Sequence, residues 1–581
     1  MLKECIEIFK KEYTKKGDRL ITDDYIPSDG TYVLVSVEND KFKIKESFDI
    51  IYNKKTKEVQ GKDNIYYKKI CEFDYNSKLL SMNKPIDSKK VIHSNNYLSF
   101  FIKKESLSNN KLTENIIDNY YDILANPKIK YTKPKAKEFY SIVENDLDKI
   151  DLDLVDKIRG FIKENIFTLE QQGINIEGKD YLKIFFDVDI KNYLNEGSRY
   201  FILNLFNSND FNQNINGDIY GLPNDNMNLN SKKPYLENKS RKNKLPNILS
   251  YKEVLIQKKF FDYLLNQASK GKSNIYVTDE KIIANESSEM PKDDLYGYYL
   301  RLKKGTEVEI IDFDIINDYK FILDKQFKLH NVVSLDEKYL EDNYKTYRDK
   351  KEIQLLLDNF MFSKFLINNY FNEPGDISIK DNILKRNILL CRNKIFNYIY
   401  KGDEVGLYKV LDKSLEDLIN ENIKQGRYIK ATHQFNLKIS LKNYFEGGEN
   451  MADIIHKIKE DLREKINSNQ TQSIKQDDEY YFAVGQLVNY LLSKSKSKNT
   501  PHHLINSFIN AKNDKFIKDK LRVLYKKYNY DDNMNGKRVK NLYAMILSYT
   551  SEGNINEDII IAGFLHSSLI YEKIKGEEVN E

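Results

Sequence analysis

The sequence predicts an α+β protein with a mixed N-terminal region, a helical middle and a C-terminal bundle made of helices alone. Two observations lead to this prediction. Short segments rich in β-branched and aromatic residues, which are typical of strands, occur only before about residue 335. From residue 336 onward, apolar residues recur at the spacing of an amphipathic helix. We therefore expect three segments, 1–335, 336–445 and 451–581.

The composition is that of a globular protein with several domains. The chain has 581 residues, a length typical of two to four domains. Its 42 Tyr and 30 Phe supply core surface although 31% of residues are charged. Lys, Asn, Ile and Tyr are abundant and Trp is absent, as in proteins from AT-rich genomes, so lysine content alone is no signal for nucleic acid. The net charge is only +5, so electrostatic binding would have to act through local patches.

Cysteine usage and hydropathy predict a cytoplasmic protein. Cys5, Cys71 and Cys391 lie far apart and form no C-x-x-C pair, which argues against a disulfide framework and against a cysteine zinc site. No apolar run approaches about 18 residues, so we expect no membrane span. The amphipathic first segment lacks the apolar core of a signal peptide.

The N-terminal region alternates expected strands with helices. A helix is expected over 250–271, where Gly271 could cap its end. The segment 207–233 is dense in Asn, Asp and Gly and predicts a long loop. Strands are expected at 30–40, 181–190, 199–207 and 307–316.

The pattern of the rest of the chain predicts helices. Helices are expected at 351–371 and 382–400, and the glycines of 447–450 interrupt the pattern. After Met451, one apolar stripe predicts the first bundle helix, and the nearly all-apolar 480–492 predicts a central one. Thr500 and Pro501 predict a helix start. Further helices at 516–528, 539–549 and 558–573 would complete a bundle of five or six.

No pattern of a catalytic or metal site stands out. The seven histidines form no H-x-x-x-H pair, and the acidic pairs at 187–189 and 312–314 have no partner motif of a nuclease. The segment 270–274 resembles the end of a phosphate-binding loop, but it follows a helix and lacks the first glycine. The sequence therefore predicts a protein that is not an enzyme and needs no metal or cofactor.

Two basic patches are candidates for binding phosphate. The first lies in 231–244; a solvated lysine-rich loop explains it equally well. The second runs from Lys494 to Lys540 and holds thirteen Lys and Arg against four Asp and Glu. The whole of 451–581 has 20 basic and 18 acidic residues, so the charge is segregated within the bundle. Codon bias does not explain segregation, which favours nucleic-acid binding.

Four stretches carry a resemblance to a known family. They are NKPIDSKKVIHSNNYLSFF (83–101), NLNSKKPYLENKSRKNKLP (228–246), YFAVGQLVNYLLSKSKSK (481–498) and GFLHSSLIYEK (563–573). With the order of elements, they make the chain resemble the large subunit of the type I-B CRISPR effector complex Cascade, the Csh family. Many relatives look as if they carry a C-x-x-C zinc knuckle, whereas 212–226 has no cysteine here, so we predict no zinc.

The resemblance implies a non-catalytic subunit of an RNA-guided complex. Such a subunit would bind the 5′ handle region of the CRISPR RNA, recognise the protospacer-adjacent motif in double-stranded target DNA and assist R-loop formation. Its other partners would be the backbone and handle-binding subunits, a recruited helicase-nuclease and separate copies of its own C-terminal bundle. The bundle resembles the small subunit of other Cascades, which would hold the target and displaced strands.

The resemblance and the basic patches together give the candidate binding residues. Asn95 and Asn96 lie beside Tyr97 in a polar run that could read base edges, although an ordinary β-turn explains the run at least as well. In the N-terminal region the candidates are Lys84, Asn95, Asn96, Lys232, Lys233, Arg241, Lys242 and Lys244. In the bundle they are Lys494, Lys496, Lys498, Lys520, Arg522, Lys526, Lys527, Lys537 and Arg538.

The segment EGGENM, which ends at Met451, has two interpretations. The codons that an AT-rich genome favours for Glu-Gly-Gly-Glu are GAA GGA GGA GAA. This string would contain AGGAGG, the complement of the bacterial ribosomal RNA tail. Met451 could then be an internal translation start that yields the bundle as a separate subunit. The alternative is a glycine linker before a helix that begins with Met.

Two alternatives to the Cascade hypothesis stay open. One is a metal-dependent nuclease or another antiviral defence enzyme. The other is a stand-alone RNA-binding protein.

Overall fold

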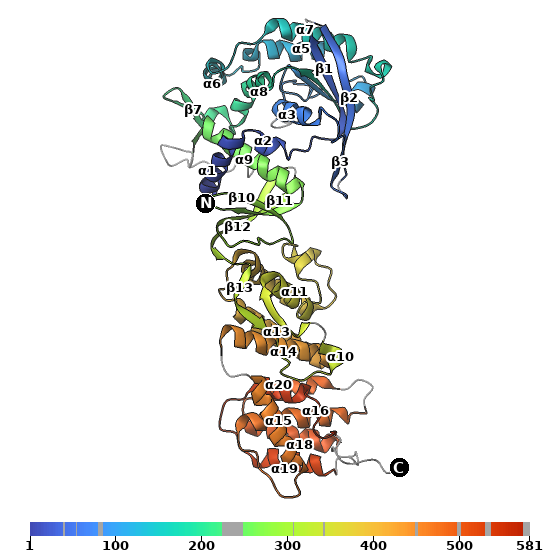
Figure 1. Cartoon of the computed structure of the whole chain (residues 1–581), viewed down its shortest axis with the longest axis vertical. Coiled ribbons are helices and arrows are strands. Elements are labelled where there is room, and N and C mark those ends of the chain that lie inside the picture. Colours follow the sequence, from blue (N-terminus) through green and yellow to red (C-terminus); the bar gives the residue numbers. More distant parts are fainter. Residues whose placement is uncertain are drawn as a thin grey trace. The chain divides into compact units, whose positions relative to one another are not determined.

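The computed structural model describes residues 1–38, 41–53, 55–79, 85–223, 248–305, 307–340, 343–447, 451–496, 501–528 and 536–572. The chain forms two compact units (Figure 1). The first unit comprises 1–289 and 297–315, and the second comprises 290–296 and 316–581. The predicted α+β class is confirmed, with strands concentrated in the first unit and helices in the second. The division into three segments stays a prediction.

A five-stranded sheet organises the first unit. Its order is β3 (Glu58–Gln60), β2 (Lys41–Asn53), β1 (Gly30–Glu38), β5 (Tyr181–Asp187) and β4 (Ser99–Lys103). β1 and β5 are parallel, and the other pairs are antiparallel. β1 is central, and its residues Tyr32 to Val35 are fully buried, as expected for a strand covered on both faces.

Four helices share one core with this sheet. They are α3 (Tyr67–Ser77), α5 (Glu114–Ala125), α7 (Leu152–Asn165) and α8 (Ile190–Asn204). The rings of Phe73 on α3 and Tyr193 on α8 stack at 4.1 Å between centroids. The short α4 (Lys104–Ser108) follows β4, and α6 (Pro134–Asn145) packs against α8.

The predicted strand at 199–207 is wrong, because most of this segment is the second half of α8. The helix begins at the N-cap Asp189, whose side chain accepts from the Lys191 backbone N–H at 2.8 Å. Its buried residues recur at helical spacing: Tyr193, Glu196, Arg199, Tyr200 and Leu203. Tertiary packing therefore overrides the strand propensity of the aromatic and β-branched residues.

The remainder of the first unit packs around a long helix. The helix predicted at 250–271 is α9 (Tyr251–Ser269), which shares a core with α1 (Leu2–Lys16), α2 (Arg19–Thr22) and a second sheet. That sheet has the order β10 (Ile282–Glu286), β9 (Lys272–Val277), β11 (Leu295–Lys304) and β12 (Val308–Tyr319). β12 confirms the strand predicted at 307–316, whereas no strand was predicted at β9.

Part of the predicted loop at 207–233 is instead a hairpin. β6 (Gln213–Ile215) and β7 (Asp218–Gly221) pair antiparallel, and β7 also pairs with β8 (Leu249–Ser250). The turn is Asn216–Gly217, with φ angles of 55° and 88°. Asn-Gly is the commonest signal of such a turn, so this hairpin could have been predicted from the sequence.

The second unit begins with a short sheet and four larger helices. β13 (Ile322–Lys328) pairs with β14 (Thr346–Asp349). The helices are α11 (Lys350–Phe360), α12 (Asn382–Phe396), α13 (Leu407–Lys424) and α14 (Tyr428–Phe445), with the short α10 (Glu337–Leu340). A π-helical turn, Asn397–Lys401, continues α12, as predicted over 382–400.

The predicted helix at 351–371 is too long, because α11 ends at Phe360. The chain turns at Ser363 and Lys364, which both have positive φ, at 53° and 67°. The buried carboxylate of Asp358 stabilises the turn, since it accepts from the Leu366 backbone N–H at 2.7 Å.

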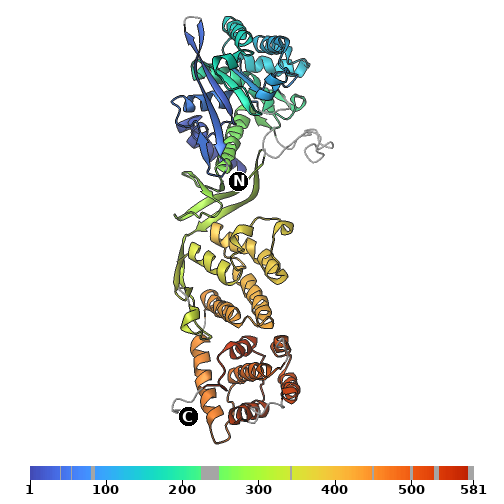
Figure 2. The ribbon, with the colours of Figure 1, turned by 90° about the vertical axis from the view of Figure 1, so that its right-hand side faces the viewer.

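The helical bundle predicted after Met451 is present (Figure 2). α15 (Met451–Asn467) runs along one side of it. The other helices are α16 (Asp477–Ser493), α17 (Asn506–Ile509), α18 (Asp514–Tyr528), α19 (Lys537–Ser548) and α20 (Glu557–Leu565). α20 ends before the predicted residue 573, because His566 is extended, with ψ of 153°.

Two helices in the bundle approach closely at glycines. A Cβ atom on Gly485 of α16 would lie 2.2 Å from the Ile560 carbonyl oxygen, and one on Gly563 of α20 would lie 2.2 Å from that of Phe482. α16 is buried almost all round, as the sequence predicted for a central helix.

Candidate nucleic-acid interface

One exposed face of α18 carries four of the basic residues that the sequence predicted to bind: Lys520, Arg522, Lys526 and Lys527. The opposite side of the helix is buried through Ile517, Leu521, Leu524 and Tyr528. The exposed face, which we call the α18 face, consists of Lys515, Phe516, Asp519, Lys520, Arg522, Val523, Lys526 and Lys527. Positions 516, 520, 523 and 527 are spaced so that they form one row along the helix. Phe516 and Val523 are 40% and 66% exposed, so the face mixes cations with apolar side chains.

Carboxylates are scarce on the α18 face. Asp519 pairs with Arg522 at 2.9 Å, and both side chains are more than half exposed, so this ion pair is weak. Asp514, at the start of the helix, is engaged by Lys518 and by the Tyr480 hydroxyl. Within the described ranges, Lys520, Lys526 and Lys527 make no ion pair. They are therefore available for phosphate oxygens.

Aromatic rings accompany these cations. The Lys520 Nζ lies 5.2 Å from the centroid of the Phe516 ring, and the Lys527 Nζ lies 5.4 Å from that of Tyr528. The half-buried rings of Tyr525 and Tyr543 stack at 4.2 Å with an interplanar angle of 12°, joining α18 to α19. Alternating cations and rings suit a single strand, whose phosphates and bases need different partners.

The structure places two other predicted bundle residues away from this face. Arg538 donates from Nε to Asn467 Oδ1 at 2.6 Å and from Nη1 to the carbonyl oxygens of Ile570 and Glu572. The half-buried guanidinium thus ties the end of α15 to the chain after α20, which gives Arg538 a structural role; that it binds phosphate stays a prediction. Lys494 is also buried, with its Nζ over the rings of Tyr490 and Tyr571.

The remaining bundle residues differ in their surroundings. Lys537 is exposed, and its Nζ donates to the Asn467 carbonyl oxygen at 2.9 Å. Lys496 is exposed at the end of α16. Lys498 lies outside the described residues.

The predicted base-reading residues Asn95 and Asn96 are buried, so that prediction is wrong. They are 3% and 0% exposed. The Asn95 amide donates to the Lys78 carbonyl oxygen at 3.3 Å, and the Asn96 amide donates to that of Tyr193 at 3.0 Å. The Asn96 Oδ1 also accepts from the Leu98 backbone N–H at 3.1 Å. These amides stabilise a turn in the core, which agrees with the β-turn alternative. Lys84, Lys232, Lys233, Arg241, Lys242 and Lys244 lie outside the described residues.

The acidic pair at 187–189 is already used by the fold. Asp187 pairs with Lys45 at 2.8 Å and with Lys69, and Asp189 caps α8. Burial opposes ionisation of Asp187, but the hydrogen bonds from the two lysines outweigh it and lower the pKa of this carboxyl group. In the part of the chain that the structure describes, no group of three or more His, Cys, Asp or Glu side chains could hold a metal ion.

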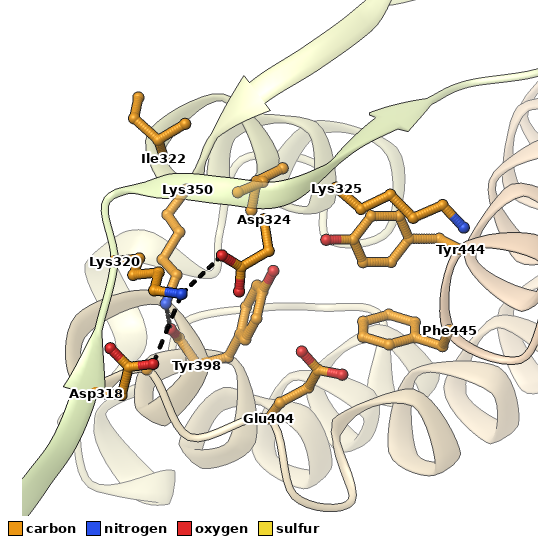
Figure 3. Close-up of a pocket in the computed structure, with 12 residues that line it drawn as sticks. Asp318, Lys320, Ile322, Asp324, Lys325, Lys350, Tyr398, Glu404, Tyr444 and Phe445 are labelled. Carbon is orange, nitrogen blue, oxygen red and sulfur yellow. Dashed lines mark hydrogen bonds and ion pairs between the residues drawn. The ribbon is translucent and has the colours of Figure 1, made fainter. Parts of the chain in front are cut away.

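A pocket of about 410 Å³ in the second unit has mixed charge (Figure 3). Its wall carries Asp318, Asp324 and Glu404 together with Lys320 and Lys325. Lys320 Nζ lies 2.8 Å from Asp324 and 3.7 Å from Asp318. We call this the mixed-charge pocket. Its three carboxylates oppose the approach of a phosphate group.

A buried lysine forms the floor of the mixed-charge pocket. Lys350 donates to the Tyr398 carbonyl oxygen at 3.0 Å and lies over the rings of Tyr319 and Tyr398. Burial lowers the pKa of Lys350 to about 8. The pocket thus holds an amine that lies over two aromatic rings and is half neutral near pH 8.

Comparison of the chain with protein-family models, with curated proteins and with solved structures found no match in any of the three. Among the described residues, no helix is both long enough and apolar enough to cross a membrane.

Proposed function

We propose that the chain is a non-catalytic, cytoplasmic, nucleic-acid-binding large subunit of a type I-B Cascade complex. The single observation that supports binding is the α18 face, where Lys520, Lys526 and Lys527 have no carboxylate partner among the described residues. The class of complex is inferred from the resemblance of the four stretches. This class implies the partners named above: CRISPR RNA, target DNA and its displaced strand, other Cascade subunits and a helicase-nuclease. In this proposal, base pairing supplies sequence specificity, and the α18 face supplies phosphate contacts to a single strand.

A charge-reversal experiment tests the α18 face. The variant Lys520→Glu/Lys526→Glu/Lys527→Glu should lose at least tenfold in affinity for single-stranded DNA at low salt. The slope of log K against log salt should fall by about 2, since each single-strand phosphate contact contributes roughly 0.7. The matched control Lys351→Glu/Lys409→Glu/Lys413→Glu changes net charge equally at exposed lysines elsewhere in the second unit. Equal weakening in the two variants would contradict the assignment.

Purification of the full chain from its own cells tests the class of complex. The expected result is co-purification with one RNA of defined length and with several companion proteins. Recovery of the chain alone, without RNA, would contradict membership of an RNA-guided complex. Incubation with labelled DNA and Mg²⁺ or Mn²⁺ tests the nuclease alternative, since cleavage that Asp187→Ala abolishes would refute a non-catalytic role.

The proposal includes separate production of the bundle from Met451. α15 begins at this residue. Synonymous recoding of the two glycine codons before Met451 leaves the long protein unchanged but removes AGGAGG from its message. We expect a second product, residues 451–581, that disappears on recoding. A short product that persists, or one that is never made, would contradict an internal start.

A further inference from the structure

A second pocket in the second unit, of about 780 Å³, differs in charge from the mixed-charge pocket. It lies between the end of α11 and the start of α14, two helices that pack against each other. Its polar side chains are Asn359, Ser363, Lys364, Arg427, Lys430 and His433. We call it the basic pocket.

The basic pocket concentrates positive charge without an acidic lining. Lys364, Arg427 and Lys430 line it, and no carboxylate among the described residues does. Two carboxyl groups lie close by but outside the lining: Asp381 is 3.6 Å from Arg427, and the buried Asp358, which interacts electrostatically with Lys364, accepts from the Leu366 backbone N–H. Burial and repulsion by Arg427 lower the pKa of Lys430, so the protein's own groups leave this positive charge incompletely compensated. An anion would relieve the repulsion.

A hydrogen-bonded turn places two polar groups of this pocket. Its residues Ser363 and Lys364 adopt positive φ, a conformation that is unfavourable for residues other than glycine. The turn is fixed because the Lys364 backbone N–H donates to the Asp358 carbonyl oxygen at 2.8 Å. It brings the Ser363 hydroxyl to 2.8 Å from the Lys430 Nζ. Strain of this kind is often found at binding sites.

The rest of the wall is aromatic and apolar. Phe360, Tyr428 and Ile429 contribute to it, and Ile429 is 41% exposed. The rings of Phe360 and His433 lie 4.9 Å apart. α14 starts at this wall with no side-chain cap, so the amide groups of its first turn add partial positive charge. A ligand that satisfies both kinds of wall has an anionic group and a flat apolar ring.

We propose that the basic pocket binds one nucleotide unit, with the phosphate at Lys364, Arg427 and Lys430 and the base against the aromatic wall. The unit could belong to a nucleic-acid strand or be a free nucleotide, and the phosphate and base are common to both. If the bound nucleotide unit belongs to a nucleic-acid strand, this inference rests on the proposed function and adds a second contact site to it. The two remain separable because the basic pocket shares no residue with the α18 face. The volume is within the range of small-molecule sites, and it exceeds that of the mixed-charge pocket.

Calorimetry with the full chain tests the proposal, with AMP, adenosine, inorganic phosphate and a short oligothymidylate as probes. AMP should bind at least tenfold more tightly than adenosine or phosphate, because it alone meets both walls. Lys364→Glu and Lys430→Met should each weaken AMP binding at least tenfold. Lys413→Glu, an exposed lysine on α13, is the control and should change nothing. Unchanged thermal melting shows that the variants fold.

The outcomes separate the sources of the ligand and the two proposals. Oligothymidylate that binds more tightly than AMP, and is weakened by Lys364→Glu, identifies a strand; AMP as the tighter ligand identifies a free nucleotide. Binding of AMP no tighter than phosphate overturns the nucleotide assignment, as does AMP affinity that Lys364→Glu leaves unchanged. The α18 triple variant should leave AMP binding intact. Failure of the AMP experiment would therefore refute only the basic pocket, and failure of the charge-reversal experiment would refute only the α18 face.

Discussion

Three buried lysines of the first unit, Lys104, Lys183 and Lys258, and the lysines of the α18 face are the same residue type in opposite surroundings. In the first unit, Lys183 pairs with Asp74 at 2.5 Å, with side chains 6% and 0% exposed. Lys104 pairs with Asp180 at 3.0 Å, and Lys258 pairs with Asp262. On the α18 face, the only carboxylate is Asp519. A lysine-rich composition therefore does not distinguish structural lysines from candidate binding lysines; the candidates are those that are exposed and have no carboxylate partner among the described residues.

The largest expected effect is at the buried pair. Asp74→Ala would leave the Lys183 ammonium buried without its partner and would remove the acceptor of the Tyr25 hydroxyl. We expect the free energy of unfolding to fall by about 3–5 kcal/mol, the usual result of breaking a buried ion pair. Denaturation in urea measures it, and Asp519→Ala is the exposed control. A loss below about 1 kcal/mol would show that burial is not what separates the two groups of lysines.

A buried histidine extends the comparison to the bundle. Burial, with repulsion by Lys459, lowers the pKa of His566 to about 4. This value lies below the pKa of a histidine in the unfolded chain, near 6.5. The neutral His566 therefore makes its full contribution to the free energy of unfolding above pH 6.5, and this contribution is lost as pH falls through 4. Over that range the free energy of unfolding should fall by about 3 kcal/mol.

Amide hydrogen exchange measures this effect locally in the full chain. Protection of α16 and α20 should fall between pH 6.5 and 4, after correction for intrinsic exchange rates. His566→Asn should remove that part of the pH dependence, whereas the control His456→Asn, at an exposed position, should keep it. An identical pH profile in the two variants would refute the role of His566.

Substitution of Arg538 tests whether a cation of the second basic patch, Lys494 to Lys540, can have a structural role. Arg538→Ala removes hydrogen bonds to Asn467 and to two backbone carbonyl groups. We expect a loss of about 1–3 kcal/mol in the free energy of unfolding. Lys540→Ala, two residues away and exposed, should change stability by less than about 0.5 kcal/mol. Equal effects of the two substitutions would mean that the guanidinium contacts contribute nothing to stability.

The sequence could predict features that depend on neighbours along the chain. The helices of the bundle follow from apolar spacing, and the α18 face follows from charge segregated within a short stretch. The helix α8 was missed because its aromatic residues favour strands locally, while packing against α3 decides the outcome. The burial of Asn96 was missed because its acceptor, the Tyr193 carbonyl, is distant in sequence.

The basic pocket could not be predicted for the same physical reason. Lys364 and Lys430 come from opposite ends of the helical middle, and only the packing of α11 against α14 brings them together. No pattern in either segment marks the turn at Ser363, because its positive φ depends on the buried Asp358. Sites assembled from distant turns require the fold to be known first.

The smallest expected effect is at the one acidic residue on the α18 face. Asp519→Asn keeps the size of the side chain but frees Arg522 from its ion pair. Because both partners are exposed, stability should change by less than about 1 kcal/mol. Binding of single-stranded DNA should tighten about two- to threefold at low salt, and the salt slope should steepen by up to roughly 0.7, the contribution of one further phosphate contact. Asp417→Asn, which breaks the exposed Arg386 pair on another helix, is the matched control and should leave binding unchanged. Weaker binding by Asp519→Asn would show that its carboxylate orients Arg522 for the strand, and the α18 face would then depend on a partnered cation after all.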